Sequence, residues 1–132
     1  MFYLSMEDVL VLYAEHVGPR EALVRSDLLE SAVALPQASM FGEDLYPHAF
    51  LKAAALLRSL AQNQAFLDGN KRIAWIACRV YLGANGIDVR TTTEEGLALM
   101  VALAGGKIDV EGLAAFLAEH SHVRTDAGEA TP

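Results

Sequence analysis

Apolar residues recur every three or four positions along most of this chain, which is the spacing that predicts amphipathic helices. Glycines, prolines and polar residues interrupt the pattern often enough to separate about six segments. We expect helices over residues 6–17, 28–35, 47–63, 70–84, 93–104 and 110–120. No two neighbouring segments alternate apolar and polar residues in the way that paired strands would. The pattern therefore predicts an all-α fold, a compact bundle of about six helices.

Capping residues indicate where several of these helices begin. Ser5 with Asp8, and Thr92 with Glu95, have the spacing of a capping box, in which two orphan N–H groups are satisfied reciprocally. Pro47 is expected as the first residue of the third helix, because its missing N–H would be unpaired there anyway. These boundaries depend only on local chemistry.

The helix over 70–84 is apolar on most of its circumference, which predicts that it is the central, buried helix of the bundle. Residues 37–46 contain a glycine and two acids without a clear period, and we expect a loop or flap there. Residues 87–89 are expected to form one extended segment. No periodic apolar residue follows position 120, so we predict a single domain over 1–120 and a flexible tail over 121–132.

Composition and charge narrow the function classes. The chain has 132 residues, is 53% hydrophobic and carries a net charge of −7. No apolar tract approaches the ~20 residues that span a bilayer, and no cationic leader is present. Cys78 is the sole cysteine, which fits a reducing compartment. We expect a soluble, cytoplasmic protein with no membrane partner, and the acidic balance argues against direct nucleic-acid binding.

One polar run in the middle of the chain, NQAFLDGNKRIAW over 63–75, does not fit a hydrophobic core. Gly69 permits a tight turn, and Asn70, Lys71 and Arg72 then form the first turn of the expected central helix. A helix N-terminus attracts anions, and cations there are unfavourable for the helix itself. Cations at the positive end of a helix are explained if a phosphate group lies between them.

Asp68 lies beside these cations, and a carboxylate next to a phosphate pocket is a common Mg²⁺ ligand. The run therefore predicts a loop-to-helix cradle for nucleotide phosphates. A structural interpretation stays open beside it, in which Asp68 and Asn70 only cap a buried helix while Lys71 and Arg72 face solvent.

The run resembles the Fic/Doc family motif, His-x-Phe-x-Asp/Asn-Ala/Gly-Asn-Lys-Arg. It matches from Phe66 to Arg72, and Gln64 stands where the family has the histidine. Lys71 and Trp75 replace a second glycine and a second arginine of adenylylating Fic enzymes, as in the death-on-curing (Doc) branch. Further stretches that are similar to that branch are LLESA, DLYPHAFLKAAALLRSLAQN, NGIDV and GGKIDVEGLAAFLAEH.

The resemblance implies a Fic/Doc-type fold and a Doc-like toxin of a toxin–antitoxin module. Such a toxin would be an ATP-dependent kinase that phosphorylates a threonine of elongation factor Tu and blocks translation. Its partner would be a Phd-like antitoxin whose C-terminal segment folds into a groove on the toxin. The resemblance also implies that Asp68 ligates Mg²⁺, and that Gly69, Asn70, Lys71 and Arg72 hold the phosphates of ATP. Alternatives are a Fic-type adenylyl transferase and a non-catalytic pseudo-enzyme that binds antitoxin or nucleotide.

Gln64 is the departure from the motif that bears most on activity. The family histidine acts as a general base toward the hydroxyl nucleophile, and a pKa near 6.5 suits it to that task. A glutamine amide can hydrogen-bond a hydroxyl but cannot accept its proton. Loss of a general base typically lowers the rate by about 10²–10⁴. We therefore predict a weak or inactive catalyst, whether Gln64 is an introduced change or natural to a pseudo-enzyme.

Two aromatic residues, a second short motif and the expected flap also bear on the predicted fold and function. Trp75 and Tyr81 fall at packing positions and are expected in the core. Thr91-x-x-x-Glu95-Gly96 formally matches the Fic self-inhibitory motif, but Glu95 already serves a helix cap and we interpret the match as chance. In the family that the chain resembles, a flap at 37–46 would align a target peptide by strand-like pairing.

Overall fold

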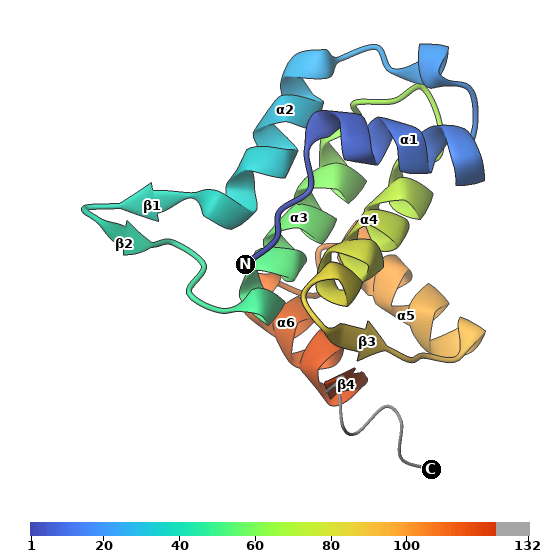
Figure 1. Ribbon diagram of the computed structural model, residues 1–132. Coiled ribbons are helices and arrows are strands. Elements are labelled where there is room, and N and C mark those ends of the chain that lie inside the picture. Colours follow the sequence, from blue (N-terminus) through green and yellow to red (C-terminus); the bar gives the residue numbers. More distant parts are fainter. Residues whose placement is uncertain (124–132) are drawn as a thin grey trace.

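The computed structural model describes residues 1–123, and over these residues it confirms the all-α class (Figure 1). Within the described chain there are six α-helices and two 3₁₀ turns. The helices are α1 (Met6–His16), α2 (Ser26–Ala34), α3 (Ala49–Asn63), α4 (Asn70–Ala84), α5 (Thr93–Ala104) and α6 (Val110–Glu119). The 3₁₀ turns are η1 (Arg20–Ala22) and η2 (Leu35–Gln37).

Helix α4 begins and ends where the pattern predicts, but it shares the centre of the molecule with α3. Helix α3 packs against α2, α4, α5 and α6, and eight of its fifteen residues are buried. Helix α4 buries six of its fifteen residues and leaves one face open. Four alanines among the buried residues of α3 let neighbouring helices approach closely. Tyr81 and Cys78 of α4 are buried as expected, and burial raises the pKa of the Cys78 thiol to about 12.

Both predicted capping boxes are present, at Ser5 for α1 and at Thr92 for α5. The expected start of α3 at Pro47 is wrong. Helix α3 begins at Ala49, because His48 has extended backbone angles and its Nδ1 accepts a hydrogen bond from the Leu51 N–H at 3.4 Å. An imidazole nitrogen thus does the capping that a Ser or Asp oxygen more often does.

Two small antiparallel sheets are present that the hydrophobic pattern does not predict. The first is a hairpin within residues 37–46, formed by β1 (Ser39–Met40) and β2 (Glu43–Asp44). Its turn residues Phe41 and Gly42 both have positive φ, 53° and 82°, as the favoured two-residue hairpin turns require. Strands of two residues are too short to show an alternation of apolar and polar residues, so the sequence pattern predicts only a loop or flap here.

The second sheet extends the ordered domain beyond the expected boundary at residue 120. Strand β4 (Ser121–Val123) pairs with β3 (Ile87–Val89), which was expected as an extended segment. The Arg90 N–H also donates to the His120 carbonyl at 2.8 Å. Residues 121–123 of the predicted tail therefore form a strand, and the rest of that prediction, residues 124–132, lies outside the described chain.

Lys52 of α3 is a buried cation that holds the base of the hairpin. Its side chain is 3% exposed, and Nζ donates to the Pro36 carbonyl at 2.8 Å and to Asp44 Oδ2 at 3.3 Å. Pro36 lies in η2 and Asp44 in β2, so one ammonium group ties both ends of the hairpin segment to α3. Among the described residues, no helix is long and apolar enough to cross a membrane.

Candidate functional site

The loop between α3 and α4 lies between two residues with left-handed backbone angles. Gln64 ends α3 with φ 58° and ψ 49°, and Gly69 precedes α4 with φ 76°. Glycine is required at the second position, because a Cβ on Gly69 would lie 2.3 Å from Val17 Cγ1 of the neighbouring chain segment. Gln64 has a Cβ and still adopts left-handed backbone angles. A non-glycine residue with such angles is uncommon and is often found at functional sites.

Strand-like hydrogen bonds fasten the first half of this loop to the segment after η1. The N–H groups of Val24 and Arg25 donate to the Ala65 carbonyl at 2.9 and 3.0 Å. The Leu67 N–H donates to the Ala22 carbonyl at 2.9 Å. The loop backbone is therefore paired across a long sequence separation, which limits its freedom before any ligand binds.

Phe66 anchors the loop in the core. Its ring is 2% exposed and stacks on Tyr13 of α1, with centroids 4.0 Å apart and planes at 7°. The Tyr13 hydroxyl donates to the Asp68 carbonyl at 2.8 Å. Burial, and secondarily the charge of Asp68, raises the pKa of Tyr13, so its hydroxyl keeps the proton that it donates.

Asn70 closes the loop from the first turn of α4. Its Oδ1 accepts from the Phe66 N–H at 3.0 Å, and its Nδ2 donates to the Phe66 carbonyl at 2.9 Å. Asp68 Oδ1 accepts from the Gly69 N–H at 2.8 Å. The Asn70 amide therefore holds the loop through Phe66, and it does not cap α4, whose N-cap residue is Gly69. Asp68 still has its second carboxylate oxygen free of any described partner.

The predicted site residues come together around one surface pocket, which we call the motif pocket. Its volume is about 440 Å³, and its remaining lining residues are Ala61 and Leu67. Lys71 and Arg72 are exposed there and form no ion pair with any described residue. The six predicted residues that line it are Gln64, Asp68, Gly69, Asn70, Lys71 and Arg72.

This arrangement suits an anionic ligand better than a metal ion alone. Two unpaired cations and the first turn of α4 supply positive potential, and Asp68 is the one carboxylate in the lining. No group of three His, Cys, Asp or Glu side chains in the described chain could hold a metal. Mg²⁺ commonly uses one or two carboxylates together with phosphate oxygens, so Asp68 fits that ion only beside a bound phosphate.

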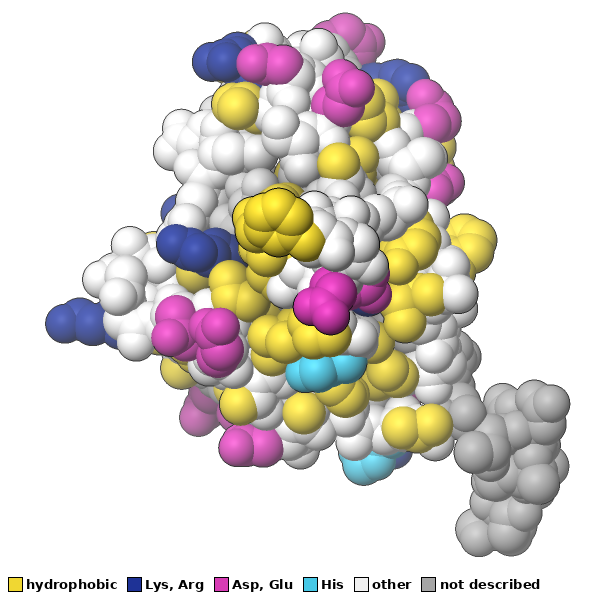
Figure 2. Space-filling view, turned by 90° about the vertical axis from the view of Figure 1, so that its left-hand side faces the viewer, with side chains coloured by type: hydrophobic (Ala, Val, Ile, Leu, Met, Phe, Trp, Pro, Cys, Tyr) yellow, Lys and Arg dark blue, Asp and Glu magenta, His cyan; other side chains and the backbone are white. Residues whose placement is uncertain are grey.

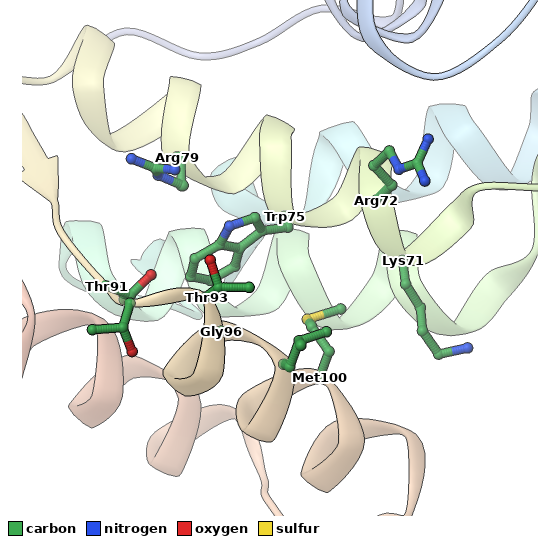
Figure 3. A pocket seen from close by; sticks show the side chains of 10 residues that line it. Lys71, Arg72, Trp75, Arg79, Thr91, Thr93, Gly96 and Met100 are labelled. Atoms are coloured by element: carbon green, nitrogen blue, oxygen red, sulfur yellow. The ribbon is translucent and has the colours of Figure 1, made fainter.

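The expectation that Trp75 lies in the core is wrong in part. Trp75 is only partly buried and lines a second pocket of about 440 Å³ between α4 and the start of α5 (Figure 3). We call this the Trp75 pocket. Lys71, Trp75 and Arg79 follow one another at four-residue spacing and therefore share a face of α4. That spacing was the signal in the sequence that could have placed Trp75 at the surface.

Glu95, the acid of the formal self-inhibitory motif, is used locally. Its Oε1 accepts from the Thr92 N–H at 2.8 Å, and its Oε2 lies 2.9 Å from His120 Nε2. The hydrogen bond of the Thr92 N–H, and after it that of His120, lowers the pKa of Glu95. This supports the interpretation of the match as a helix cap.

The hairpin β1–β2 projects from the body of the molecule beyond α2 and α3 (Figure 1). Met40, Phe41 and Leu45 expose their side chains, and Phe41 at the tip is 98% exposed. Figure 2 views the molecule from this side, where hydrophobic side chains lie among scattered acidic groups. An exposed hairpin with apolar side chains is suited to contact with another polypeptide.

Known proteins are similar to this chain over most of its length. Residues 3–82 match the Fic/DOC family. The chain is also similar to the protein "Toxin Doc" of Mycolicibacterium smegmatis, with 42% identity over 118 residues that cover 88% of this chain and 91% of that protein. The family match includes α1, the motif loop and α4 as far as Leu82. The chain belongs to the Fic/Doc family.

Proposed function

We propose that this chain is a Doc-type toxin of a toxin–antitoxin module, built to transfer the γ-phosphate of ATP to a threonine of elongation factor Tu. The similarity to "Toxin Doc", which spans nearly the whole of both chains, supports the toxin assignment. The single observation that carries the chemistry is the motif pocket, where unpaired Lys71 and Arg72 flank the first turn of α4 beside Asp68. Phosphoryl transfer depends mainly on positioning and charge neutralisation, which these groups can supply.

Each residue of the motif pocket has a distinct proposed task. Lys71 and Arg72 bind the phosphate oxygens, and the N–H groups at the start of α4 add their dipole. The free oxygen of Asp68 would hold Mg²⁺, which would screen the phosphate charge when bound. Asn70 keeps the loop closed through Phe66, so that these groups stay in place without a ligand. The hydrogen bonds between the loop backbone and residues 22–25 also hold the site in this arrangement before a ligand binds.

Gln64 makes the chain a poor catalyst, because it stands at the position of the general base. It lies in the motif pocket next to Asp68, where the proton of an attacking hydroxyl would need an acceptor. Its amide has no useful basicity, so the reaction loses about 10²–10⁴ in rate. Nucleotide and antitoxin binding do not need that proton transfer and should persist.

The hairpin is the proposed docking element for the protein substrate. Its two short strands have open edges, and an extended segment of a partner can pair with such an edge. The Phd-like antitoxin is proposed as the stable partner in the cell. Lys52 fixes the base of the hairpin, so the distance from hairpin to motif pocket is set by α3.

A Fic-type adenylyl transferase and a non-catalytic pseudo-enzyme are the other two candidates. Lys71 and Trp75 stand where adenylylating enzymes have glycine and arginine, which favours the kinase over the transferase. Gln64 is the observation that favours the pseudo-enzyme.

The deciding experiment restores the base with Gln64→His and offers elongation factor Tu together with ATP labelled at either the γ- or the α-phosphate. Gln62→His is the matched control, because Gln62 is an exposed glutamine on the same helix outside the motif pocket. We expect γ-label in the factor with Gln64→His and no gain with Gln62→His. Transfer of the α-label would instead support the adenylyl transferase. Absence of both labels from a folded Gln64→His protein that binds ATP would support the pseudo-enzyme.

A further inference from the structure

The Trp75 pocket and the motif pocket both lie along α4. Lys71 and Arg72 line both pockets, at the start of that helix. Arg79 lies at the far end of the Trp75 pocket, and Figure 3 shows the indole of Trp75 between Arg79 and the Lys71–Arg72 end. A volume of about 440 Å³ is within the range of small-molecule sites.

The lining of this pocket is unusual for a chain with a net charge of −7. It contains three cations, Lys71, Arg72 and Arg79, and no carboxylate. The other side of the pocket is the start of α5 and the segment before it, where Thr91 and Thr93 line the pocket and the Thr93 hydroxyl is turned toward the indole (Figure 3). Neither hydroxyl has a hydrogen-bond partner among the described residues, so both are available to a polar ligand.

The indole ring of Trp75 is a flat apolar surface with polar and cationic side chains around it. It is the one tryptophan of the chain, and it is partly buried against the core. The Arg79 guanidinium carbon lies 6.0 Å from the ring centre, and Arg79 Nη2 donates to the Val89 carbonyl at 3.0 Å, which holds the arginine in position. An aromatic face beside cations and hydroxyls is the combination that binds a nucleobase and its sugar.

Space for such a ligand is left by Gly96 of α5. A Cβ added at Gly96 would meet only Thr91 Oγ1, at 3.8 Å. A large side chain at this position would project into the pocket without disturbing the backbone. Gly96 therefore offers a way to block the pocket that leaves Trp75 in place.

We propose that the Trp75 pocket binds the nucleoside end of a purine nucleotide, with the base stacked on Trp75, while the motif pocket holds its phosphates. This inference rests on the proposed function, because it specifies the rest of the same nucleotide site. It makes Trp75 a binding residue that the motif does not define. Discrimination between a nucleotide and bare polyphosphate would then depend on α4 and α5 together.

The test compares two ligands that share phosphates and differ in the nucleoside. Binding of ATP with Mg²⁺ and of inorganic tripolyphosphate with Mg²⁺ is measured by calorimetry on the full chain, and Trp75 fluorescence is followed in the same titrations. We expect ATP, and not tripolyphosphate, to quench the fluorescence strongly. Trp75→Leu should weaken ATP binding roughly 5- to 100-fold and tripolyphosphate binding less than about 2-fold.

Two further variants protect the test against a folding defect. Trp75→Phe keeps a stacking face and should retain most of the affinity for ATP. Gly96→Leu fills the pocket and should weaken ATP binding while tripolyphosphate binding persists. Phe2→Leu, which changes an exposed aromatic residue near the N-terminus, should change the binding of neither ligand.

The outcomes separate this inference from the proposed function. If ATP binds but Trp75→Leu and Gly96→Leu leave its affinity unchanged, the nucleoside end lies elsewhere and the inference is wrong, while the proposed function stands. If neither ATP nor tripolyphosphate binds the folded wild-type chain, the nucleotide site itself is refuted and this inference with it.

Discussion

The glycine that precedes α4, Gly69, offers the sharpest test of the site geometry. Gly69→Ala adds one methyl group at a residue with φ 76°, and the new Cβ would lie 2.3 Å from Val17 Cγ1. Contacts between carbon atoms are optimal near 3.5–4.0 Å, so the overlap exceeds about 1 Å. The loop or the end of α1 must move to relieve it.

The expected loss in free energy of unfolding for Gly69→Ala has two parts that can be separated. An L-residue in the left-handed region costs about 1–2 kcal/mol, partly offset by a less flexible unfolded chain. Overpacking of this kind adds about 1–3 kcal/mol. Gly106→Ala is the matched control, because Gly106 has φ 68° and no atom within 4 Å of its added Cβ. We therefore expect Gly69→Ala to destabilise by about 2–5 kcal/mol and Gly106→Ala by about 1–2 kcal/mol.

Urea unfolding followed by circular dichroism measures both changes. Val17→Ala removes the atom that Gly69→Ala would strike, so the double variant should be less destabilised than the sum of the single variants by about 1–2 kcal/mol. Because Gly69 joins Asp68 to Asn70, Gly69→Ala should also weaken ATP binding. Equal losses at Gly69 and Gly106, together with additivity of Gly69→Ala and Val17→Ala within about 0.5 kcal/mol, would refute the close approach of α1 to the loop.

Three more predictions concern the hairpin, the motif loop and the sheet. Lys52→Met removes the donor that ties Asp44 to α3, so hydrogen exchange of hairpin amides should quicken by about 5- to 10-fold; unchanged exchange would show that Lys52 does not hold the hairpin. Gln64→Gly relieves a left-handed non-glycine residue and should raise the free energy of unfolding by up to about 1 kcal/mol; a loss of stability would contradict that strain. The pKa of His120 is raised first by its hydrogen bond with the Phe116 carbonyl and then by Glu95. The resulting stability is complete below the usual pKa of about 6.5 and is lost as pH rises through the folded value, so the stability difference between wild type and His120→Gln should shrink from pH 6 to pH 9.

Local chemistry made much of this fold predictable from the sequence alone. The capping boxes at Ser5 and Thr92 act within three residues, so their effect does not depend on the rest of the molecule. The span of α4 followed from Gly69 before it and from apolar spacing within it. The grouping of the six site residues followed as well, because five of them are consecutive from Asp68 to Arg72, and Gln64 lies four residues before that run.

Features that depend on contacts between distant segments were decided only by the tertiary structure. Strand β4 pairs with β3 across more than thirty intervening residues, and strands of three residues carry no pattern of their own. Lys52 is buried because Pro36 and Asp44 meet it there, whereas a lysine by itself predicts exposure. Trp75 shows the opposite case. An apolar side chain by itself predicts burial, but Trp75 shares a face of α4 with Lys71 and Arg79, and the position of α5 leaves its ring at the edge of a pocket.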